Sequence, residues 1–195
     1  EALSASRRYG LEVIPGVELS ASTGGREIHL LGYDPRLPEE IGAVLIKLRR
    51  ERYRRMQKMV ARLRRLGINI TDPEVLAEAG SAAPGRLHLA RLLVKKGYTR
   101  DIGTAFSLYL EQGRPGFVPR TVLDPAQAIN LLHRSGAIPV IAHPGAAGKG
   151  LLRDLVSMGL RGVEVIHPEH TPEMVRYYRY QAKRMGLLIT GGSDF

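Results

Sequence analysis

The sequence contains no cysteine among its 195 residues. Without thiols the chain has neither a disulfide scaffold nor thiolate metal ligands, and it suits a reducing compartment, so we expect a cytoplasmic protein. No apolar run approaches the roughly 20 residues that a helix needs to cross a bilayer, so no membrane partner is expected. The chain does not begin with methionine, and the lack of a signal peptide therefore carries no weight.

Acidic residues are scarce relative to basic ones. The chain has 29 Lys and Arg against 19 Asp and Glu, which gives a formal charge of +10 at pH 7. An excess of this size favours acidic partners, with nucleic acid or phosphorylated metabolites first. A charge excess that only solvates the surface is the simpler alternative.

The basic residues are densest between Lys47 and Arg65, where Glu51 is the only acid. Apolar residues recur there at spacings of three and four, so the segment is predicted to be a helix whose charged face lies in solvent. A basic track for an RNA backbone is the alternative. Tyr53 is the only aromatic residue of the run, so stacking of nucleic-acid bases is not indicated.

The first part of the chain changes from strand-like to helical patterning. A strand pair is predicted at residues 11–14 and 28–33, with Gly24 and Gly25 as the turn between them. Helical periodicity follows, and residues 37–118 are predicted to be all-helical. The expected helices are 39–66, one that begins after Thr71, 87–96 and 101–111.

From residue 119 onward, helices and strands alternate. Such alternation is typical of parallel β/α units. The 44% hydrophobic composition is sufficient for a sizeable core. We therefore predict an α/β framework formed by residues 1–36 and 119–195, interrupted by a helical insertion at 37–118. The expected elements are helix 125–133, strand 137–142, helix 151–158, strand 163–166, helix 172–186 and strand 187–190.

Four side chains able to bind metal lie within or directly after β-like runs: Glu18, His29, His143 and Asp194. Strand ends in parallel α/β folds converge on one site, so we expect the four to meet on one face. Carboxylate and imidazole groups are ligands that Zn, Mn or Fe accepts. Each residue also has an ordinary alternative: Glu18 a solvated strand end, His29 a hydrogen-bonded core residue, and Asp194 a helix N-cap.

The segments around these residues resemble motifs of the PHP family, the polymerase and histidinol phosphatase family of metal-dependent phosphoesterases. The matching segments are Gly16-Val17-Glu18, Glu27-Ile28-His29-Leu30-Leu31-Gly32-Tyr33, Ile141-Ala142-His143-Pro144-Gly145 and Gly191-Gly192-Ser193-Asp194-Phe195.

The resemblance implies a distorted β/α barrel of TIM-like type and a site for three divalent ions, Mn, Zn or Fe. It assigns Glu18, His29, His143 and Asp194 as metal ligands. Glu18 and His143 would also be catalytic, in the hydrolysis of a phosphate ester by a metal-activated hydroxide.

The chain lacks other motifs of that family. Members begin with a His-x-His segment and carry a His directly after Ser-Asp-Phe, and neither is present here. We therefore expect the chain to be an internal part of a longer protein. By itself it should bind metal weakly, because each missing ligand removes charge and geometry from a multi-metal site.

Three further residues are candidates for substrate binding. Arg86 and His88 begin a helix of the insertion, where free backbone N–H groups and positive charge favour phosphate. His170, with His167, follows strand 163–166, a segment that the resemblance places near the substrate. A loop residue beside the Thr171 helix cap is the alternative for His170.

The helical insertion resembles one branch of the family, which hydrolyses nucleoside 3′,5′-bisphosphates and trims short RNA from the 5′ end. The expected partner is thus a phosphorylated nucleotide or short RNA, with no obligate protein partner. Alternatives are a histidinol-phosphatase-like enzyme, a polymerase-associated PHP module, or a non-catalytic basic RNA-binding or scaffold domain.

Overall fold

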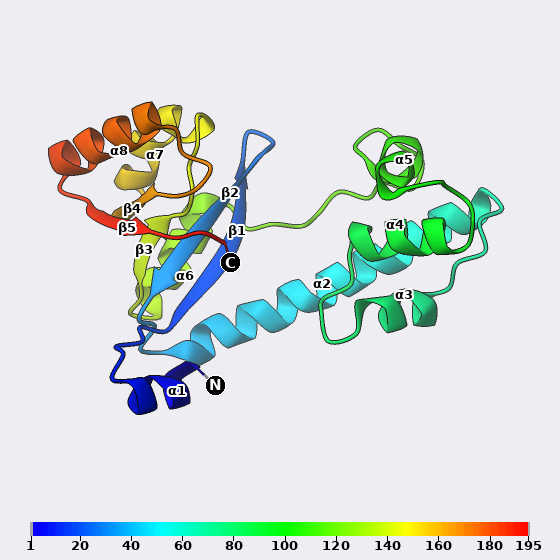
Figure 1. Ribbon diagram of the computed structural model, residues 1–195, viewed down its shortest axis with the longest axis horizontal. Helices are drawn as coiled ribbons and strands as arrows, with labels where there is room; N and C mark the ends of the chain where they lie inside the picture. The colour runs from blue at the N-terminus through cyan, green and yellow to red at the C-terminus, as the bar shows by residue number, and fades with distance from the viewer. Residues whose placement is uncertain (1, 195) are drawn as a thin grey trace. The chain divides into compact units, whose positions relative to one another are not determined.

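The computed structural model describes residues 2–194, which form two compact units (Figure 1). The first, called the sheet unit here, consists of residues 2–43 and 122–194. The second, the helical unit, is Val44–Thr121. Within the described residues no helix is both long enough and apolar enough to span a membrane.

The sheet unit is built on five strands in the order β1-β2-β3-β4-β5. β2 pairs antiparallel with both β1 and β3, whereas β3, β4 and β5 run parallel, as the helix–strand alternation predicted. The strands are β1 Gly16–Thr23, β2 Arg26–Tyr33, β3 Ile138–Ile141, β4 Gly162–Ile166 and β5 Leu188–Gly191.

The β1–β2 hairpin confirms the predicted turn and corrects the first predicted strand. Gly24 and Gly25 join the strands with φ values of 55° and 78°, the left-handed geometry that tight hairpins require. Residues 11–14 are irregular rather than a strand, and β1 begins only at Gly16, after a proline that lacks a backbone N–H. Glu18 consequently lies inside a strand and not beyond its end.

The sheet is open within the described residues, with β1 and β5 at its two edges. A closed TIM-like barrel is therefore not seen. The parallel strands are joined by helices, β3 to β4 through α7 and β4 to β5 through α8. α8 contacts β4 and β5, while α6, which precedes β3, contacts β1, β2 and β3. The helices of this unit are α1 Ala2–Tyr9, α6 Pro125–Arg134, α7 Leu152–Ser157 and α8 Pro172–Met185, with a 3₁₀ turn at Ala147–Gly150.

Local signals explain where these helices begin. The Asp124 carboxylate accepts a hydrogen bond from Ala126 N at 2.9 Å, and the Thr171 hydroxyl accepts one from Met174 N at 3.3 Å. A proline follows each cap, where its missing N–H costs nothing. The sheet's core is aliphatic and includes Leu19, Leu30, Val140 and Val163, all at most 1% exposed.

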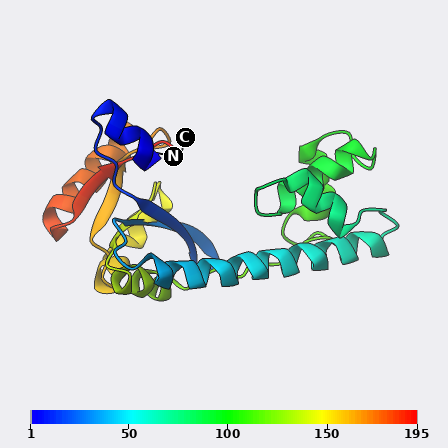
Figure 2. The ribbon, with the colours of Figure 1, turned by 90° about the horizontal axis from the view of Figure 1, so that it is seen from below.

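The helical unit has its own apolar core. The long helix α2 starts at Pro38 in the sheet unit and runs without interruption to Arg65 (Figure 2). The other helices are α3 Asp72–Ala79, α4 Arg86–Lys95 and α5 Ile102–Ala105, followed by a π-helical turn at Phe106–Leu110. The buried side chains come from all of them and include Met56, Met59, Leu63, Ile70, Val75, Leu89, Leu93, Ala105 and Leu110.

Two arginines of α2 also hold the segment by which the chain leaves this unit. Arg55 Nε donates to Val118 O at 2.7 Å, and Arg62 donates to Phe117 O. Some of the arginines of α2 therefore form hydrogen bonds within the unit and are not merely solvated.

Candidate metal centre

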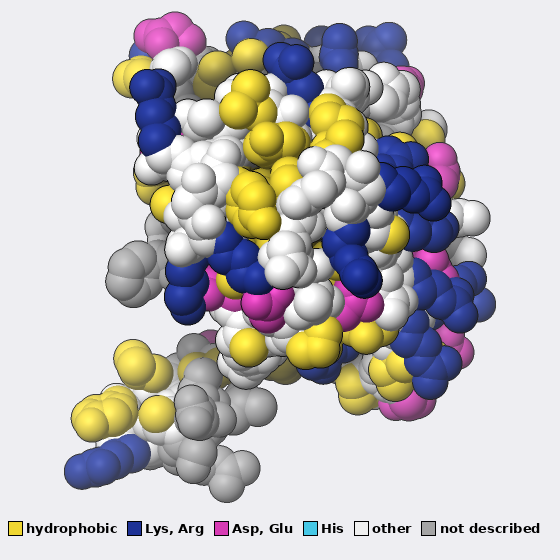
Figure 3. Space-filling view, turned by 90° about the vertical axis from the view of Figure 1, so that its right-hand side faces the viewer, with side chains coloured by type: hydrophobic (Ala, Val, Ile, Leu, Met, Phe, Trp, Pro, Cys, Tyr) yellow, Lys and Arg dark blue, Asp and Glu magenta, His cyan; other side chains and the backbone are white. Residues whose placement is uncertain are grey.

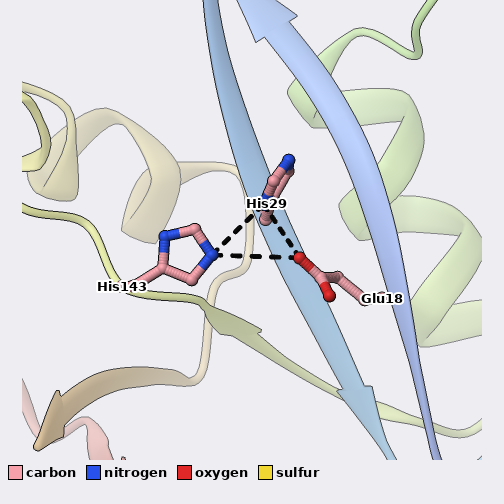
Figure 4. A group of neighbouring side chains, drawn as sticks. All are labelled: Glu18, His29 and His143. Carbon is pink, nitrogen blue, oxygen red and sulfur yellow. Dashed lines mark hydrogen bonds and ion pairs between the residues drawn. The ribbon is translucent and has the colours of Figure 1, made fainter. Parts of the chain in front are cut away.

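Glu18, His29 and His143 meet on one side of the sheet (Figure 4). Glu18 Oε1 lies 2.8 Å from His29 Nδ1 and 3.9 Å from His143 Nε2, and the two imidazole nitrogens are 3.2 Å apart. The three atoms all lie within 4.8 Å of one another. This spacing is short enough for one cation to contact all three groups.

Strand register explains the meeting. His29 pairs with Ser20, so Glu18 is the diagonal neighbour of His29 on the same face of the hairpin. Ala142 N donates to His29 O at 3.0 Å just after β3 ends, which places His143 beside His29. Backbone hydrogen bonds between neighbouring strands thus bring together two residues of the hairpin and one that follows β3.

Asp194 lies at the border of this cluster. Its Oδ2 is 3.6 Å from His143 Nε2 and 3.6 Å from His167 Nε2, while its side chain is 57% exposed. Asp194 and His143 both have positive φ, 56° and 24°. Such backbone geometry is costly for residues other than glycine and gathers at functional sites.

A buried carboxylate that the sequence analysis did not single out supports His143. Glu164, in β4, is 3% exposed, and its Oε2 accepts a hydrogen bond from His143 N at 2.8 Å. A Cβ at Gly192 would collide with Glu164 Oε1, so that glycine lets the chain pass close to the carboxylate. The sequence did contain a signal for Glu164, because it lies between Val163 and Val165 in a predicted strand. Charged residues are rarely buried without a partner, so an acid at such a position indicates a specific contact.

His167 is the second residue that the sequence analysis underweighted. Its side chain is 2% exposed, and Nδ1 accepts a hydrogen bond from Glu169 N at 3.3 Å. With Nδ1 as acceptor, the neutral ring carries its proton on Nε2. That buried Nε2 has no hydrogen-bond partner among the described residues, and it lies next to Asp194.

His170 is tied to the main chain through both ring nitrogens. Nδ1 donates to Val165 O at 3.0 Å, and Nε2 accepts from Gly145 N at 3.1 Å. Its ring also stacks on Tyr178, with centroids 5.5 Å apart. His170 thus fixes the turn after His143, and both nitrogens are already in use.

Tyr178 completes the support of that turn. It is fully buried, and its hydroxyl donates to Gly145 O at 2.5 Å. Burial raises the pKa of the Tyr178 phenol well above its usual value, with a smaller contribution from Tyr177, so the hydroxyl stays a donor at every physiological pH. The backbone that presents His143 is consequently held from two sides.

Arg86 and His88 lie in the helical unit, at the N-terminal end of α4. The Arg86 guanidinium lies 5.7 Å from the ring centroid of Phe106 and 5.9 Å from that of Phe117. His88 Nδ1 accepts from Gly85 N at 3.1 Å, which caps the helix and leaves the ring proton on Nε2. Both residues are partly exposed at a helix end suited to anions.

The donor set fits a divalent cation. Two imidazole nitrogens and a carboxylate oxygen crowd together, and the single proton of each neutral imidazole cannot satisfy every close pair among them. A cation that accepts N and O ligands, such as Zn, Mn or Fe, would satisfy all three lone pairs at once. The buried Nε2–H of His167 lies 3.6 Å from Asp194 Oδ2 and is a hydrogen-bond donor at the border of this cluster, not a lone pair for the cation.

An α/β sheet that brings imidazoles and a carboxylate together at this spacing could hold a metal ion. The chain is 32% identical over 212 residues to a 3′,5′-nucleoside bisphosphate phosphatase of Chromobacterium violaceum, covering 100% of this chain and 71% of the relative. It is 33% identical over 206 residues to a 5′-3′ exoribonuclease of Haemophilus influenzae, covering 100% of this chain and 73% of that relative. The chain belongs to the PHP family and is a metal-dependent phosphoesterase, a hydrolase of phosphoester bonds.

Solved structures agree with this assignment. A Bifidobacterium adolescentis protein assigned as a metal-dependent phosphoesterase superposes with a TM-score of 0.81 at 29% identity, covering 100% of this chain and 71% of that one. No family model matches the chain.

Proposed function

We propose that this protein removes phosphate from nucleotides, acting on nucleoside 3′,5′-bisphosphates and on the 5′ end of short RNA. The approach of Glu18, His29 and His143 to within 4.8 Å of one another carries the proposal. The two relatives named above support the substrate class, since one is a nucleoside bisphosphate phosphatase and the other a 5′-3′ exoribonuclease. Because the two relatives are named for different substrates, the relative activity on mononucleotides and on RNA is a matter for measurement.

In this proposal Glu18, His29, His143 and Asp194 hold divalent ions, Mn, Zn or Fe, in a site for up to three of them. A bound divalent ion supplies an acidified water near neutral pH and neutralises charge on the phosphoryl group. Glu18 and His143 also act as the catalytic residues in this proposal. Glu164 keeps His143 in place through the 2.8 Å hydrogen bond to its backbone N–H.

The remaining side chains orient the substrate. The His167 Nε2–H can donate to Asp194 or to a phosphate oxygen placed beside it, because it is buried and unpartnered within the described residues. His170 contributes by fixing Gly145 and the turn after His143. Arg86 and His88 bind a phosphate of the substrate at the start of α4, where guanidinium geometry favours bidentate contacts.

We further propose that the sheet unit is part of a distorted β/α barrel into which residues 37–118 are inserted as a helical subdomain. The division of the chain at Val44 and Thr121 supports the insertion. The 53% and 47% exposure of Leu188 and Ile189 in the edge strand β5 supports further strands beyond it, because large aliphatic side chains there would otherwise remain in water.

The test is phosphate release from adenosine 3′,5′-bisphosphate with Mn²⁺, before and after treatment with a chelator. We expect hydrolysis that the chelator abolishes and added Mn²⁺ restores. A histidinol phosphate control separates the nucleotide proposal from a histidinol-phosphatase-like activity, and preference for histidinol phosphate would contradict the proposal. Absence of hydrolysis of either ester with Mn²⁺ bound would favour a non-catalytic RNA-binding domain.

Arg86→Ala tests the substrate role of the helical unit. Loss of a charge-assisted hydrogen bond worth about 1.5–3 kcal/mol should raise KM for the bisphosphate roughly 10- to 100-fold with a smaller change in kcat. Arg86→Lys is the matched control, because it keeps the charge and loses the bidentate geometry. Unchanged kinetics in Arg86→Ala would remove this residue from the substrate site.

A further inference from the structure

A groove of about 610 Å³ lies on the helical unit. Its lining reaches Pro84, two residues before α4 begins, but does not include Arg86 or His88. One wall is a single face of α2, formed by Ile46, Arg49, Arg50, Tyr53, Arg54 and Gln57 at helical spacing. The other wall comes from Leu76 and Pro84, with the short segment between them. The volume lies in the range of sites that hold a nucleotide-sized ligand.

The groove combines apolar surface with positive charge. Ile46, Tyr53 and Leu76 are 56%, 36% and 38% exposed, so apolar and aromatic surface faces solvent along it. The three lining arginines are exposed, and the lining contains no acidic residue. Arg49 and Arg50 make no hydrogen bond or ion pair within the described part of the chain, whereas Arg54 pairs with Glu51 at 2.8 Å. Two cations at the groove are thus available to a ligand.

The charge around this groove is concentrated in one unit of the chain. Residues 44–121 contain 17 Lys and Arg against six Asp and Glu, a formal charge of +11, while the rest of the chain contains 12 against 13. Lys and Arg side chains surround hydrophobic patches on the face of the molecule drawn in Figure 3. A polyanion is therefore the occupant favoured by charge complementarity.

Tyr53 decides which polyanion fits best. In the sequence it was a lone aromatic residue without stacking partners, but the structure places it in the groove between arginines one turn before and one residue after it. An exposed aromatic ring one helical turn from two unpaired guanidinium groups, those of Arg49 and Arg50, is the combination that holds an unpaired base and its neighbouring phosphates. An acidic peptide would pair with Arg49 and Arg50 but, without an aromatic side chain of its own, would leave the Tyr53 ring unstacked.

We propose that this groove binds single-stranded RNA, with a base against Tyr53 and phosphates on Arg49 and Arg50. The groove is an accessory binding site and does not take part in hydrolysis. The inference rests on the proposed function only in taking RNA as a substrate, for which the groove would raise affinity for chains over mononucleotides. It predicts that the protein distinguishes RNA from a nucleoside bisphosphate by a surface outside the metal centre.

The test is fluorescence anisotropy of a 3′-labelled 10-nucleotide single-stranded RNA, in chelator so that no hydrolysis occurs. Relative to the unsubstituted protein, Arg49→Ala with Arg50→Ala should weaken binding about 10-fold or more at moderate salt. The slope of log affinity against log salt should fall by about 1.4, because roughly 0.7 is lost per phosphate contact on single strands. Tyr53→Ala should weaken binding roughly 10-fold, and Tyr53→Phe should not.

The matched control is Arg64→Ala with Arg65→Ala, which removes the same charge from exposed positions of α2 outside the groove. Hydrolysis of adenosine 3′,5′-bisphosphate should be unchanged in all these variants, and circular dichroism checks that each is folded. Equal loss in the groove and control pairs, or full affinity in Tyr53→Ala, would overturn the inference. So would a groove that binds an acidic peptide but no RNA. If hydrolysis fails while these affinities behave as expected, only the proposed function is lost.

Discussion

The sheet unit and the helical unit differ in the chemistry that they carry. Five of the chain's six histidines, all but His88, lie in the sheet unit, whose acidic and basic residues nearly balance. The helical unit holds one histidine and all of the excess positive charge, +11 against −1 for the rest of the chain. Groups that can hold metal and groups that can hold phosphate backbones are therefore concentrated in different units. In the proposed function, catalysis and attraction of the substrate therefore belong to separate stretches of one chain.

The units also differ in how their structure arises. The three described non-glycine residues with positive φ, Asp34, His143 and Asp194, are all in the sheet unit. The helical unit consists of α-helices and one π-helical turn around an apolar core. Strained backbone persists only where surrounding structure holds it, as Glu164, His170 and Tyr178 do around His143. The site thus depends on long-range contacts, while the helical unit follows from local periodicity.

The largest expected effect comes from His143→Ala, which separates the two units functionally. Removing this imidazole should lower hydrolysis by more than about 100-fold, because a ligand at the centre of the cluster is lost, beyond the 10- to 100-fold typical of supporting residues. RNA affinity in chelator should not change. His133→Ala is the control, since His133 Nε2 bonds Gly159 O at 2.7 Å outside the site. A His143→Ala enzyme of normal activity would remove this cluster from catalysis.

A smaller loss of activity is expected from Glu164→Ala, a substitution that tests whether a remote carboxylate holds the backbone at His143. Without the carboxylate, the His143 N–H loses its acceptor, and metal affinity measured by calorimetry should fall roughly 10- to 100-fold with a parallel loss of activity. Partial recovery in Glu164→Gln, which keeps an acceptor oxygen, would mark a positioning role. Glu169→Gln, an exposed acid nearby, should be neutral. If Glu169→Gln lowered metal affinity as much as Glu164→Ala, the loss would come from the removed negative charge and not from the hydrogen bond to His143 N.

The smallest expected effect is a pH dependence confined to the helical unit. The Lys96 ammonium, with the Thr71 backbone and hydroxyl, lowers the pKa of Glu74 from 4.5 to about 2. The ionised carboxylate therefore stabilises the folded state above pH 4.5, and this contribution disappears as the pH falls toward 2. Glu74→Gln should lower the Tm slightly at pH 7 and match the unsubstituted protein near pH 2. A difference that grows toward acid pH would contradict this linkage.

Much of the fold was predictable because its signals are local. The helices after Thr71 and Asp124 begin at caps, α8 ends at Gly186, and the apolar spacing of α2 matches its buried stripe. The strand expected at 11–14 was wrong, because β-branched residues there have no neighbouring strand to pair with in the described residues. Strand propensity shows only that a segment fits a sheet, and pairing partners decide the outcome.

Sequence patterns were enough to predict the types of residue available for chemistry, the helical middle of the chain and the motifs around Glu18, His29, His143 and Asp194. Tertiary structure alone decided that the first three share one position, because strand register joins residues 114 positions apart. It also brought in Glu164 and His167 and turned Tyr53 from an isolated aromatic residue into part of a groove. Burial, register and distance depend on contacts between remote segments, which no local pattern records.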